Sequence, residues 1–255
     1  MRFLMLNWRD PKNPLSGGAE RVTHAYLNAL AERGHEVFQF SYDFPGAKPY
    51  EKIDGVHIHR AGGMFSAIRA ARKWYRQQPR FDLVIDQHHG IPWYAPWWCK
   101  TNSVSYIHEV LGPIWNSFYP WPISAIGRWQ ERLTHRFYGD IPFFTASTFT
   151  REKLIEHGVK SVTIIPYGVH TVAVPLLEPK VLAEPLKLIM VSRLAPNKRI
   201  GHGIEALRSV IQLGIRAELT VIGTGEEEAK LRELTKTLRL EKSVRFTGQI
   251  GRAHV

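Results

Sequence analysis

Short, mostly apolar runs alternate with helix-spaced apolar residues along the first part of the chain. Such runs favour buried strands. Between the first two runs, Val22, Tyr26, Ala29 and Leu30 fall on one face of a helix, which Gly34 ends. The chain therefore opens as a Rossmann-like strand–loop–helix–strand unit, which predicts an α/β fold. The strands predicted in this part lie at residues 2–7, 37–40, 81–86, 103–107, 142–147 and 161–165.

An aromatic segment and a helix come before the last two of these strands. Residues 112–122 are rich in aromatic residues and proline, and too irregular for the interior of a helix. This loop fits an acceptor-side lip, a membrane contact, or side chains packed beneath a loop. The spacing of Ile126, Trp129 and Leu133 then predicts a helix over residues 123–137 with one apolar face.

A second α/β domain follows a stretch without strong periodicity. Residues 171–185 contain three prolines and predict a linker. We therefore expect a first domain at residues 1–170 and a second at residues 186–255. The elements predicted in the second domain are a buried strand at 188–191, a helix with Ile200, Ile204, Leu207 and Ile211 on one face, a strand at 218–222, a helix with Leu231, Leu234 and Leu238, and a strand at 244–246.

Composition limits the classes of protein that fit. The chain has 255 residues, 44% hydrophobic and 22% charged, which is an ordinary globular balance with room for two modest domains. One cysteine, Cys99, excludes an internal disulfide framework and fits a reducing compartment. No apolar run approaches the roughly 18 residues of a membrane span. The N-terminus is charged too early for a signal peptide, so we expect a cytoplasmic protein.

The net charge of +11 points to anionic partners. Residues 64–80 contain five basic side chains and no acidic one, and all eight tryptophans lie before residue 130. A basic amphipathic helix with clustered tryptophans is typical of a helix lying on an anionic membrane surface, here the inner face. The alternative is a solvated helix with tryptophans used for packing. Nucleic acid is not expected, because the sequence has no helix-turn-helix, zinc knuckle or RNP-like strand.

The turn after the strand at 188–191 carries two cations. Arg193 follows the strand, and Lys198 begins the next helix. In open α/β sheets ligands bind at the carboxyl ends of the strands, and helix N-termini favour anions. Two cations at such a point suit a diphosphate better than a single carboxylate. The alternative is that both are solvated loop charges.

Other polar residues also follow predicted strands. His108 and Glu109 come directly after the strand at 103–107, at the rim where ligands bind; the alternative is a histidine hydrogen-bonded within a loop. The adjacent His88 and His89 diverge on an extended chain, and nothing nearby is spaced to complete a metal site. The dinucleotide fingerprint is absent after the first strand, which argues against an NAD enzyme.

Several motifs resemble glycosyltransferase family 4, also called group 1. The resemblance rests on SGGAERV and LAERGHEV near the N-terminus and on VSRLAPNK, IGTGEEEAKL and VRFTGQI in the second domain. It covers the whole chain and implies a GT-B fold of two Rossmann-like domains. It also implies transfer of a hexose from a nucleotide-sugar donor, a UDP- or GDP-sugar, to a glycan or lipid-linked acceptor. The transfer retains anomeric configuration and uses no cofactor and no metal.

The resemblance also implies roles for individual residues. His108 matches a histidine near the transferred sugar and is the expected catalytic residue. Tyr167 and His170 stand where the family carries Asn and Asp, so those side chains are not assigned. The expected donor-binding residues are Arg193, Lys198, Gly17, Gly18, Gly223 and Gly225, and the expected acceptor-side residues are Glu20 and Glu109.

The chain departs from the family at its end. The family's second domain continues for roughly the same length again, on the usual size of such a domain. In the family, the missing part carries a motif of two glutamates with seven residues between them, which grips the sugar and ribose of the donor. We therefore expect a chain truncated within an incomplete second domain, with impaired transfer. Two alternatives stay open: a non-catalytic remnant that binds nucleotide or membrane, and an interaction module that self-associates through the incomplete domain.

Overall fold

The computed structural model describes residues 1–88, 90–168 and 183–248. These form two compact units. Unit 1 comprises residues 1–115 and 121–171, and unit 2 comprises the described residues of 116–120 and 172–255. Most of the predicted linker, residues 171–182, lies outside the described residues, as does His170.

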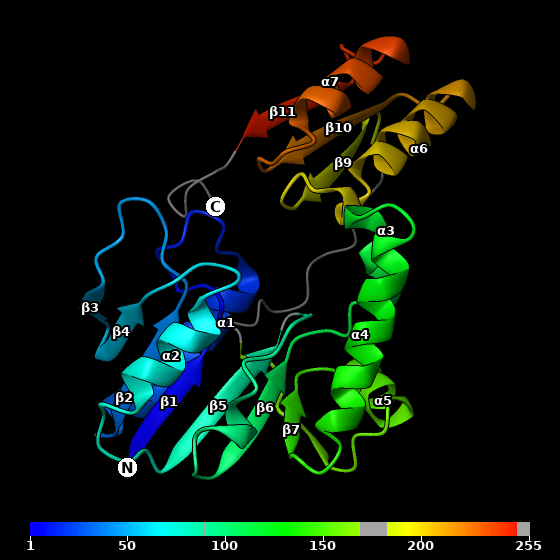
Figure 1. The fold of residues 1–255 in the computed structure, drawn as a ribbon. Coiled ribbons are helices and arrows are strands. Elements are labelled where there is room, and N and C mark those ends of the chain that lie inside the picture. The colour runs from blue at the N-terminus through cyan, green and yellow to red at the C-terminus, as the bar shows by residue number, and fades with distance from the viewer. Residues whose placement is uncertain (89, 169–182, 249–255) are drawn as a thin grey trace. The chain divides into compact units, whose positions relative to one another are not determined.

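Unit 1 is built on an eight-stranded sheet (Figure 1). Its order is β3-β4-β2-β1-β5-β6-β7-β8, and all neighbours pair in parallel except β3 and β4. The antiparallel β3–β4 hairpin is an addition to the strands predicted from the apolar runs. The strands are β1 (Arg2–Leu6), β2 (Glu36–Ser41), β3 (Tyr50–Ile53), β4 (Val56–Arg60), β5 (Leu83–His88), β6 (Ser103–Ile107), β7 (Phe143–Thr145) and β8 (Val162–Ile164).

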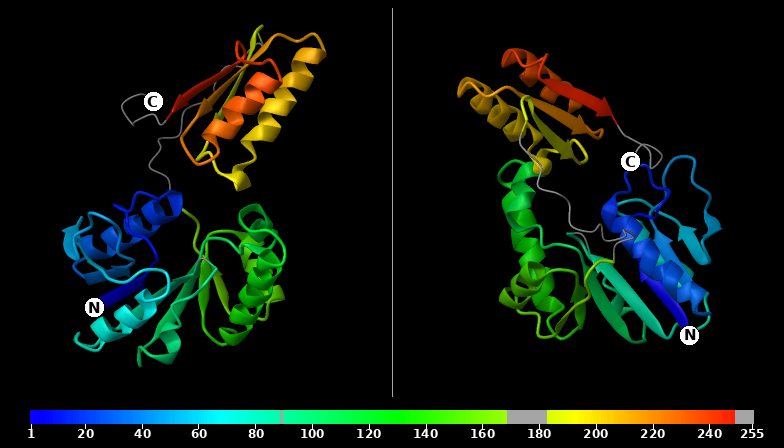
Figure 2. Two further views of the ribbon diagram at one scale, coloured as in Figure 1. Left: turned by 45° about the horizontal axis from the view of Figure 1, so that its top comes forward. Right: turned by 180° about the vertical axis from the view of Figure 1, so that it is seen from behind.

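Helices cover both faces of this sheet (Figure 2). Along β1, Phe3 and Met5 join the cluster that contains Leu27 of α1, whereas Leu4 and Leu6 join the cluster beneath α2. Successive strand residues point to opposite faces, so an unbroken apolar run is what a sheet buried on both faces requires. The helices of unit 1 are α1 (Gly18–Glu32), α2 (Ala67–Tyr75), α4 (Ile123–Phe137) and α5 (Thr148–Glu156), with 3₁₀ turns at Ala95–Trp97 and Gly112–Ile114. The short helix α3 (Trp115–Phe118) begins at the last residue of the first segment of unit 1 and continues into the segment assigned to unit 2.

One expectation for the segment before β7 needs correction, and the orientation of the helix there is a new finding. The aromatic loop at residues 112–122 is not wholly irregular, because it contains the 3₁₀ turn and α3. Helix α4 has the predicted bounds, but Ile126, Trp129 and Leu133 lie on its exposed side. The side that packs on unit 1 is polar and small, so the apolar periodicity located the helix and not its buried face.

Unit 2 contains a three-stranded parallel sheet in the order β11-β10-β9. Figure 2 shows its two helices on one face of this sheet. The core between the helices and the sheet contains Ile204, Leu207 and Val221. The elements are β9 (Leu186–Val191), α6 (Ile200–Gln212), β10 (Ala217–Ile222), α7 (Glu228–Thr237) and β11 (Val244–Gly248).

The expectation of a fully buried β9 is wrong. Ile189 is 63% exposed and Val191 is 67% exposed. Strand β9 is at one edge of the described sheet. Helices α6 and α7 cover only one face of that sheet, and Ile189 and Val191 lie on the opposite face. An apolar run cannot by itself distinguish a strand covered on both faces from one covered on a single face.

No helix in the ranges described above is both long enough and apolar enough to cross a bilayer.

Candidate functional site

The carboxyl edge of the unit 1 sheet gathers several of the predicted residues. From β1 the chain moves to β2 on one side and later returns to β5 on the other side. This reversal is the point at which open α/β sheets bind ligands. The loop after β1 leads to Gly17 and Gly18 at the start of α1, and His108 follows β6.

His108 is held by a network of polar side chains. Its Nε2 lies 3.1 Å from Gln87 Nε2, and Gln87 Oε1 accepts a 2.9 Å hydrogen bond from the Thr23 hydroxyl. Its Nδ1 lies 2.6 Å from the Tyr167 hydroxyl and 3.2 Å from the Tyr106 hydroxyl. Because the Gln87 amide donates to Nε2, the proton of the neutral ring belongs on Nδ1. The network therefore selects one tautomer of His108.

The two tyrosines of this network are protonated at neutral pH. Desolvation raises the pKa of Tyr106 and that of Tyr167 above the ordinary value. Thr150 donates from its hydroxyl to the His108 carbonyl at 3.3 Å, which fixes the backbone at the end of β6. Glu109 is exposed beside it at the rim.

The glycines at the start of α1 are not required by packing. A Cβ at Gly18 would meet no described atom within 4 Å, and one at Gly17 would meet only the Glu20 carboxylate at 3.7 Å. Glu20, expected on the acceptor side, accepts a 2.6 Å hydrogen bond from the N–H of the N-cap residue Gly17, which is one half of a capping-box arrangement. The glycine loop is thus tied to its own helix with open space beside it.

A buried ion pair anchors the loop that precedes these glycines. The Arg60 guanidinium donates from Nε and Nη2 to the two oxygens of Asp10, at 2.6 and 2.8 Å. Both side chains are fully buried, and Arg60 also donates to Glu51 at 2.6 Å. A bidentate pair of this kind fixes the loop rigidly to the end of β4.

In unit 2 the two predicted donor loops are bonded to each other. Ser192 N–H donates to the Ile222 carbonyl at 3.1 Å, and Leu194 N–H donates to the Thr224 carbonyl at 2.9 Å. Arg193 lies between these two bonds, and its side chain is exposed. The backbone at Arg193 is therefore fixed while the guanidinium extends to solvent.

Gly223 and Gly225 make this contact possible. A Cβ on Gly223 would lie 1.9 Å from the Ser192 carbonyl oxygen, and one on Gly225 would lie 2.3 Å from the Leu194 carbonyl oxygen. Gly223 also has a φ of +137°, which side chains rarely adopt. Both glycines are needed for the loops to touch, whether or not a ligand is present.

Lys198 lies two residues before the start of α6. It ends the 3₁₀ turn Pro196–Lys198 and is exposed, and the N-cap residue Arg199 makes no side-chain capping bond. Within residues 1–88, 90–168 and 183–248, no hydrogen bond or ion pair is made by the side chains of Arg193 and Lys198. Two unpaired cations beside an uncapped helix N-terminus favour an anion.

The family of the chain follows from its sequence. Residues 16–172 match Glycosyltransferase Family 4, and residues 178–255 match Glycosyl transferases group 1. The chain belongs to glycosyltransferase family 4. The predicted resemblance is confirmed, and with it transfer of a sugar as the activity of the family.

Curated relatives of this family-4 chain are longer than it is. The GtfA subunit of a UDP-N-acetylglucosamine–peptide N-acetylglucosaminyltransferase from Limosilactobacillus reuteri is 27% identical over 247 residues, which are 90% of this chain and 43% of the relative. A poly(glycerol-phosphate) alpha-glucosyltransferase from Bacillus subtilis is 29% identical over 126 residues, which are 48% of this chain and 18% of the relative. The chain thus spans less than half the length of either.

Solved structures show the same fold. Anabaena HepE, in complex with UDP and glucose, has a TM-score of 0.63 at 15% identity and covers 98% of this chain and 70% of its own. S. aureus TarM, in a complex that includes UDP, has a TM-score of 0.65 at 10% identity and covers 98% of this chain and 77% of its own. The predicted α/β fold of GT-B type is confirmed.

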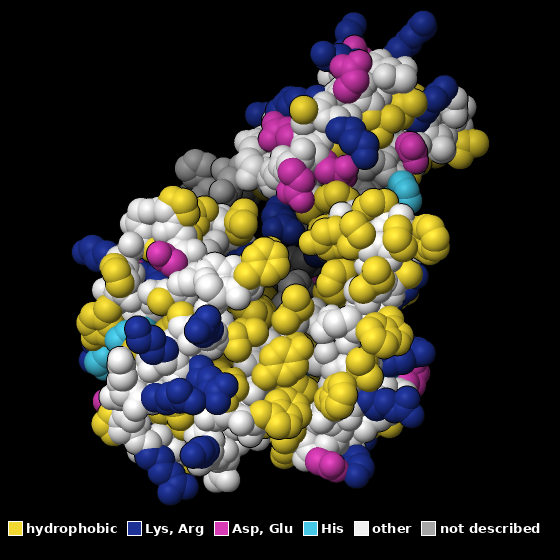
Figure 3. Space-filling view, viewed as in Figure 1, with side chains coloured by type: hydrophobic (Ala, Val, Ile, Leu, Met, Phe, Trp, Pro, Cys, Tyr) yellow, Lys and Arg dark blue, Asp and Glu magenta, His cyan; other side chains and the backbone are white. Residues whose placement is uncertain are grey.

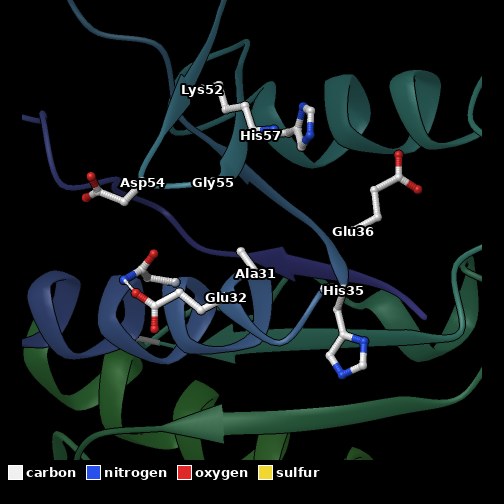
Figure 4. Close-up of a pocket in the computed structure, with 10 residues that line it drawn as sticks. Ala31, Glu32, His35, Glu36, Lys52, Asp54, Gly55 and His57 are labelled. Carbon is white, nitrogen blue, oxygen red and sulfur yellow. Dashed lines mark hydrogen bonds between the residues drawn. The ribbon is translucent and has the colours of Figure 1, made fainter.

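A hollow of about 470 Å³ lies elsewhere on unit 1, at the amino ends of the strands. Figure 4 shows Glu32, His35 and Glu36 in its lining, with side chains that point apart and not toward a common centre. In this family-4 fold the hollow is at the sheet edge opposite to His108. We assign no ligand to it.

Side chains that could ligate a metal do not cluster among the described residues. The described part of the chain contains no group of three or more His, Cys, Asp or Glu side chains that could hold a metal ion. His88 is buried, with its ring edge-on to Tyr138, and His89 lies outside the described residues.

Sequence reasoning missed most partners of His108. Thr23, Gln87 and Tyr106 lie on three different elements, and Tyr167 is 59 residues away from His108 along the chain. Tyr167 is a departure from the family pattern, and the departure itself was the available signal. Tyr167 stands where the family carries an asparagine, and its hydroxyl contacts the expected catalytic histidine.

Proposed function

We propose that this chain supplies an acceptor-side unit and a donor-side unit of a retaining glycosyltransferase. It moves a hexose from a nucleotide-diphosphate donor to a glycan or lipid-linked acceptor. The observation that carries the proposal is the pair of exposed cations, Arg193 and Lys198, on the fixed loops at the carboxyl edge of the unit 2 sheet.

The chemistry of transfer explains why cations are needed there. When the bond between the sugar carbon and the diphosphate oxygen breaks, negative charge develops on the leaving nucleoside diphosphate. Arg193 offers parallel N–H donors in a planar fork, and Lys198 offers a compact charge. Because the backbone beneath Arg193 is already fixed, little reorganisation is required as that charge develops.

Unit 1 is proposed to hold the sugar and the acceptor. His108 contacts the transferred sugar. Its tautomer is set by Gln87, and Tyr167 bonds to the other ring nitrogen. Gly17 and Gly18 leave open space for donor and acceptor to approach the backbone. Glu20 and Glu109 lie on the acceptor side, although Glu20 also caps α1.

A UDP-sugar is the proposed donor ahead of a GDP-sugar. A relative is named for UDP-N-acetylglucosamine, and two proteins of the same fold have been solved with UDP. The Arg and Lys contacts go to the diphosphate, which both donors share, so the base must be selected by other residues.

Calorimetric titration of the chain with UDP, GDP and ADP tests the proposal. We expect saturable binding of UDP that Arg193→Ala weakens at least about tenfold, because an Arg–phosphate contact is charge-assisted. The matched control is Arg208→Ala, which removes an exposed arginine from the middle of α6 and leaves binding unchanged. Equal UDP binding by Arg193→Ala and Arg208→Ala would show that Arg193 does not contact the donor.

A second candidate function is self-association through unit 2. It is supported by Ile189 and Val191, which are exposed on the uncovered face of the described sheet. Light scattering after size exclusion distinguishes the two candidates. A wild-type dimer that becomes a monomer in Val191→Ser supports self-association, and a wild-type monomer at all concentrations contradicts it.

We also propose that the protein acts peripherally at the cytoplasmic face of an anionic membrane. Helix α2 supports this, because Arg69, Arg72 and Lys73 are exposed on it and Arg76 follows at its C-cap. Cations of this kind attract anionic headgroups, but they do not insert.

A further inference from the structure

Helix α4 of unit 1 turns its apolar side outward. Trp129 is 65% exposed and Phe137 is 69% exposed. The exposed apolar residues, named here the α4 stripe, are Ile123, Ile126, Trp129, Leu133 and Phe137. The buried residues of the same helix are Ser124, Gly127, Glu131, Thr134 and His135.

Contacts on the buried side fix this orientation. The Glu131 carboxylate accepts hydrogen bonds from the N–H groups of Leu111, at 2.7 Å, and Gly112, at 2.8 Å. Gly127 lies against the Trp115 ring so closely that a Cβ would come within 2.5 Å of it. The helix therefore cannot roll to bury its apolar side without breaking buried hydrogen bonds.

Three arginines line one margin of the α4 stripe. Arg128, Arg132 and Arg136 follow one another at intervals of one turn. At 3.6 residues per turn the stripe covers a sector of roughly 120°, and the arginines fall in the adjacent sector of roughly 80°. Because Glu131 is buried, the charged side chains on the outer side of α4 are all basic.

Of the helices near α4 in unit 1, α2 adds cations, whereas the acidic and basic side chains of α5 balance. Figure 3 shows hydrophobic side chains along α4 and a group of Lys and Arg over α2 on the same face of unit 1. Next to α4, helix α5 carries Arg151 and Lys153 together with Glu152 and Glu156, of which Lys153 and Glu156 form an ion pair at 2.7 Å. The face as a whole is apolar and basic.

We propose that α4 is the element that inserts into the membrane, with its stripe at the boundary between headgroups and acyl chains. Large apolar residues bordered by arginines are the pattern of helices that lie in a bilayer interface. The arginines bind the phosphates of anionic lipids, and α2 adds longer-range attraction. This inference sharpens the proposed membrane association, which rests on α2, and it is independent of the nucleotide site.

Charge decides between a membrane and a second copy of the chain. Pairing of two α4 stripes brings three arginines of one copy near three of the other, in a protein whose net charge is already +11. Such pairing is opposed by like-charge repulsion, whereas an anionic bilayer supplies the opposite charge over a continuous surface.

Sedimentation with vesicles tests the inference. Vesicles of phosphatidylcholine alone are compared with vesicles that contain about one third phosphatidylglycerol, at low and high salt. The wild type is expected to bind only the anionic vesicles at low salt. The double variant Ile126→Ser/Trp129→Ser, which leaves the buried side intact, is expected to bind at least about tenfold more weakly.

Matched controls separate insertion from general effects. Leu213→Ser/Ile215→Ser removes two exposed apolar side chains from unit 2 and is expected to bind like the wild type. Arg132→Glu/Arg136→Glu is expected to lose anionic binding, whereas Arg208→Glu/Arg239→Glu retains most of it. Circular dichroism and UDP titration of each variant report whether the fold and the nucleotide site are intact.

Three results would overturn the inference. One is absence of wild-type binding at low salt. Another is equal vesicle binding by the wild type and Ile126→Ser/Trp129→Ser. The third is a dimer that this double variant converts to a monomer, since the stripe is then an interface between copies. None of these results affects the UDP titration, which tests the proposed nucleotide site separately.

Discussion

At the scale of single residues, His108 is defined more by its neighbours than by its own position. Gln87 and Tyr167 bond to opposite nitrogens of the ring, and they reach it from β5 and from the loop after β8. The position of His108 at the end of a strand could be read from the sequence. The tautomer could not, because it depends on side chains brought together by the sheet.

The first prediction concerns this tautomer. At alkaline pH the wild type is expected to show His108 with its proton on Nδ1, and Gln87→Leu is expected to lose that preference because Nε2 no longer accepts a hydrogen bond. Long-range ¹H–¹⁵N spectra of the ring distinguish the two forms. Tyr167→Phe is the control and keeps the wild-type tautomer. A wild-type ring protonated on Nε2 contradicts the network as described.

The second prediction concerns the anchor of the glycine loop. Arg60→Met leaves the fully buried Asp10 carboxylate without its partner, so the free energy of unfolding of unit 1 is expected to fall by about 3–5 kcal/mol. Lys160→Met removes the exposed pair with Asp140 and is expected to leave the urea midpoint nearly unchanged. Similar midpoints for the two variants would mean that the buried pair contributes little.

At the scale of elements, apolar periodicity predicted which segments are strands and helices better than which face they bury. The order of strands and helices, and bounds such as those of β6 and α4, follow from the spacing of apolar residues. The outward side of α4 and the exposed face of β9 do not, because an apolar stripe looks the same whether it meets a core, a membrane or solvent. The β3–β4 hairpin was also missed, since its outer strand alternates between exposed and half-buried residues.

The third prediction concerns the contact between the two donor loops. Gly225→Ala places a Cβ 2.3 Å from the Leu194 carbonyl oxygen, which forces the loops apart. We expect unit 2 to lose about 2 kcal/mol or more of stability and UDP binding to weaken. Gly214→Ala is the control: its φ of +85° is strained, but no atom lies within 4 Å, so the cost is about 1 kcal/mol and UDP binding is unchanged. Equal effects of the two variants contradict the loop contact.

At the scale of the whole molecule, buried titratable groups predict sensitivity to acid. Burial lowers the pKa of His88 and that of His135 to about 3, and it raises the pKa of Asp86 to about 6. The histidine contribution to stability is complete above pH 6.5 and is lost as pH falls toward 3. Asp86 acts in the opposite direction between about pH 4 and 6, and offsets one of the two histidines.

The fourth prediction follows from this sum. For these three groups alone, the unfolded chain binds about one more proton than the native chain between pH 6 and 4, which lowers the free energy of unfolding by about 1.4 kcal/mol per pH unit. His59, whose pKa is lowered by burial to about 4, adds to this fall, and Glu131, whose pKa is raised by burial, opposes it. Urea midpoints measured across this range test it. His135→Gln removes the contribution of one buried histidine, so the free energy of unfolding is expected to depend less steeply on pH. Stability that rises on acidification contradicts the account.

The division into two units bears on what the chain can do alone. The expected catalytic histidine lies in unit 1, and the two cations lie in unit 2. The loops of unit 2 are held by bonds within that unit. The proposed binding of a donor diphosphate therefore concerns unit 2, and it can be tested in this chain without an acceptor.

The measurement that tests the proposed diphosphate site most directly is the mapping of amide chemical shifts on addition of UDP. The account predicts that signals from residues 192–194, from Gly223–Gly225 and from the start of α6 move together with one dissociation constant, and that Arg193→Ala abolishes these shifts. Shifts confined to the hollow beside His35, or shifts that persist in Arg193→Ala, would contradict a diphosphate site at Arg193 and Lys198.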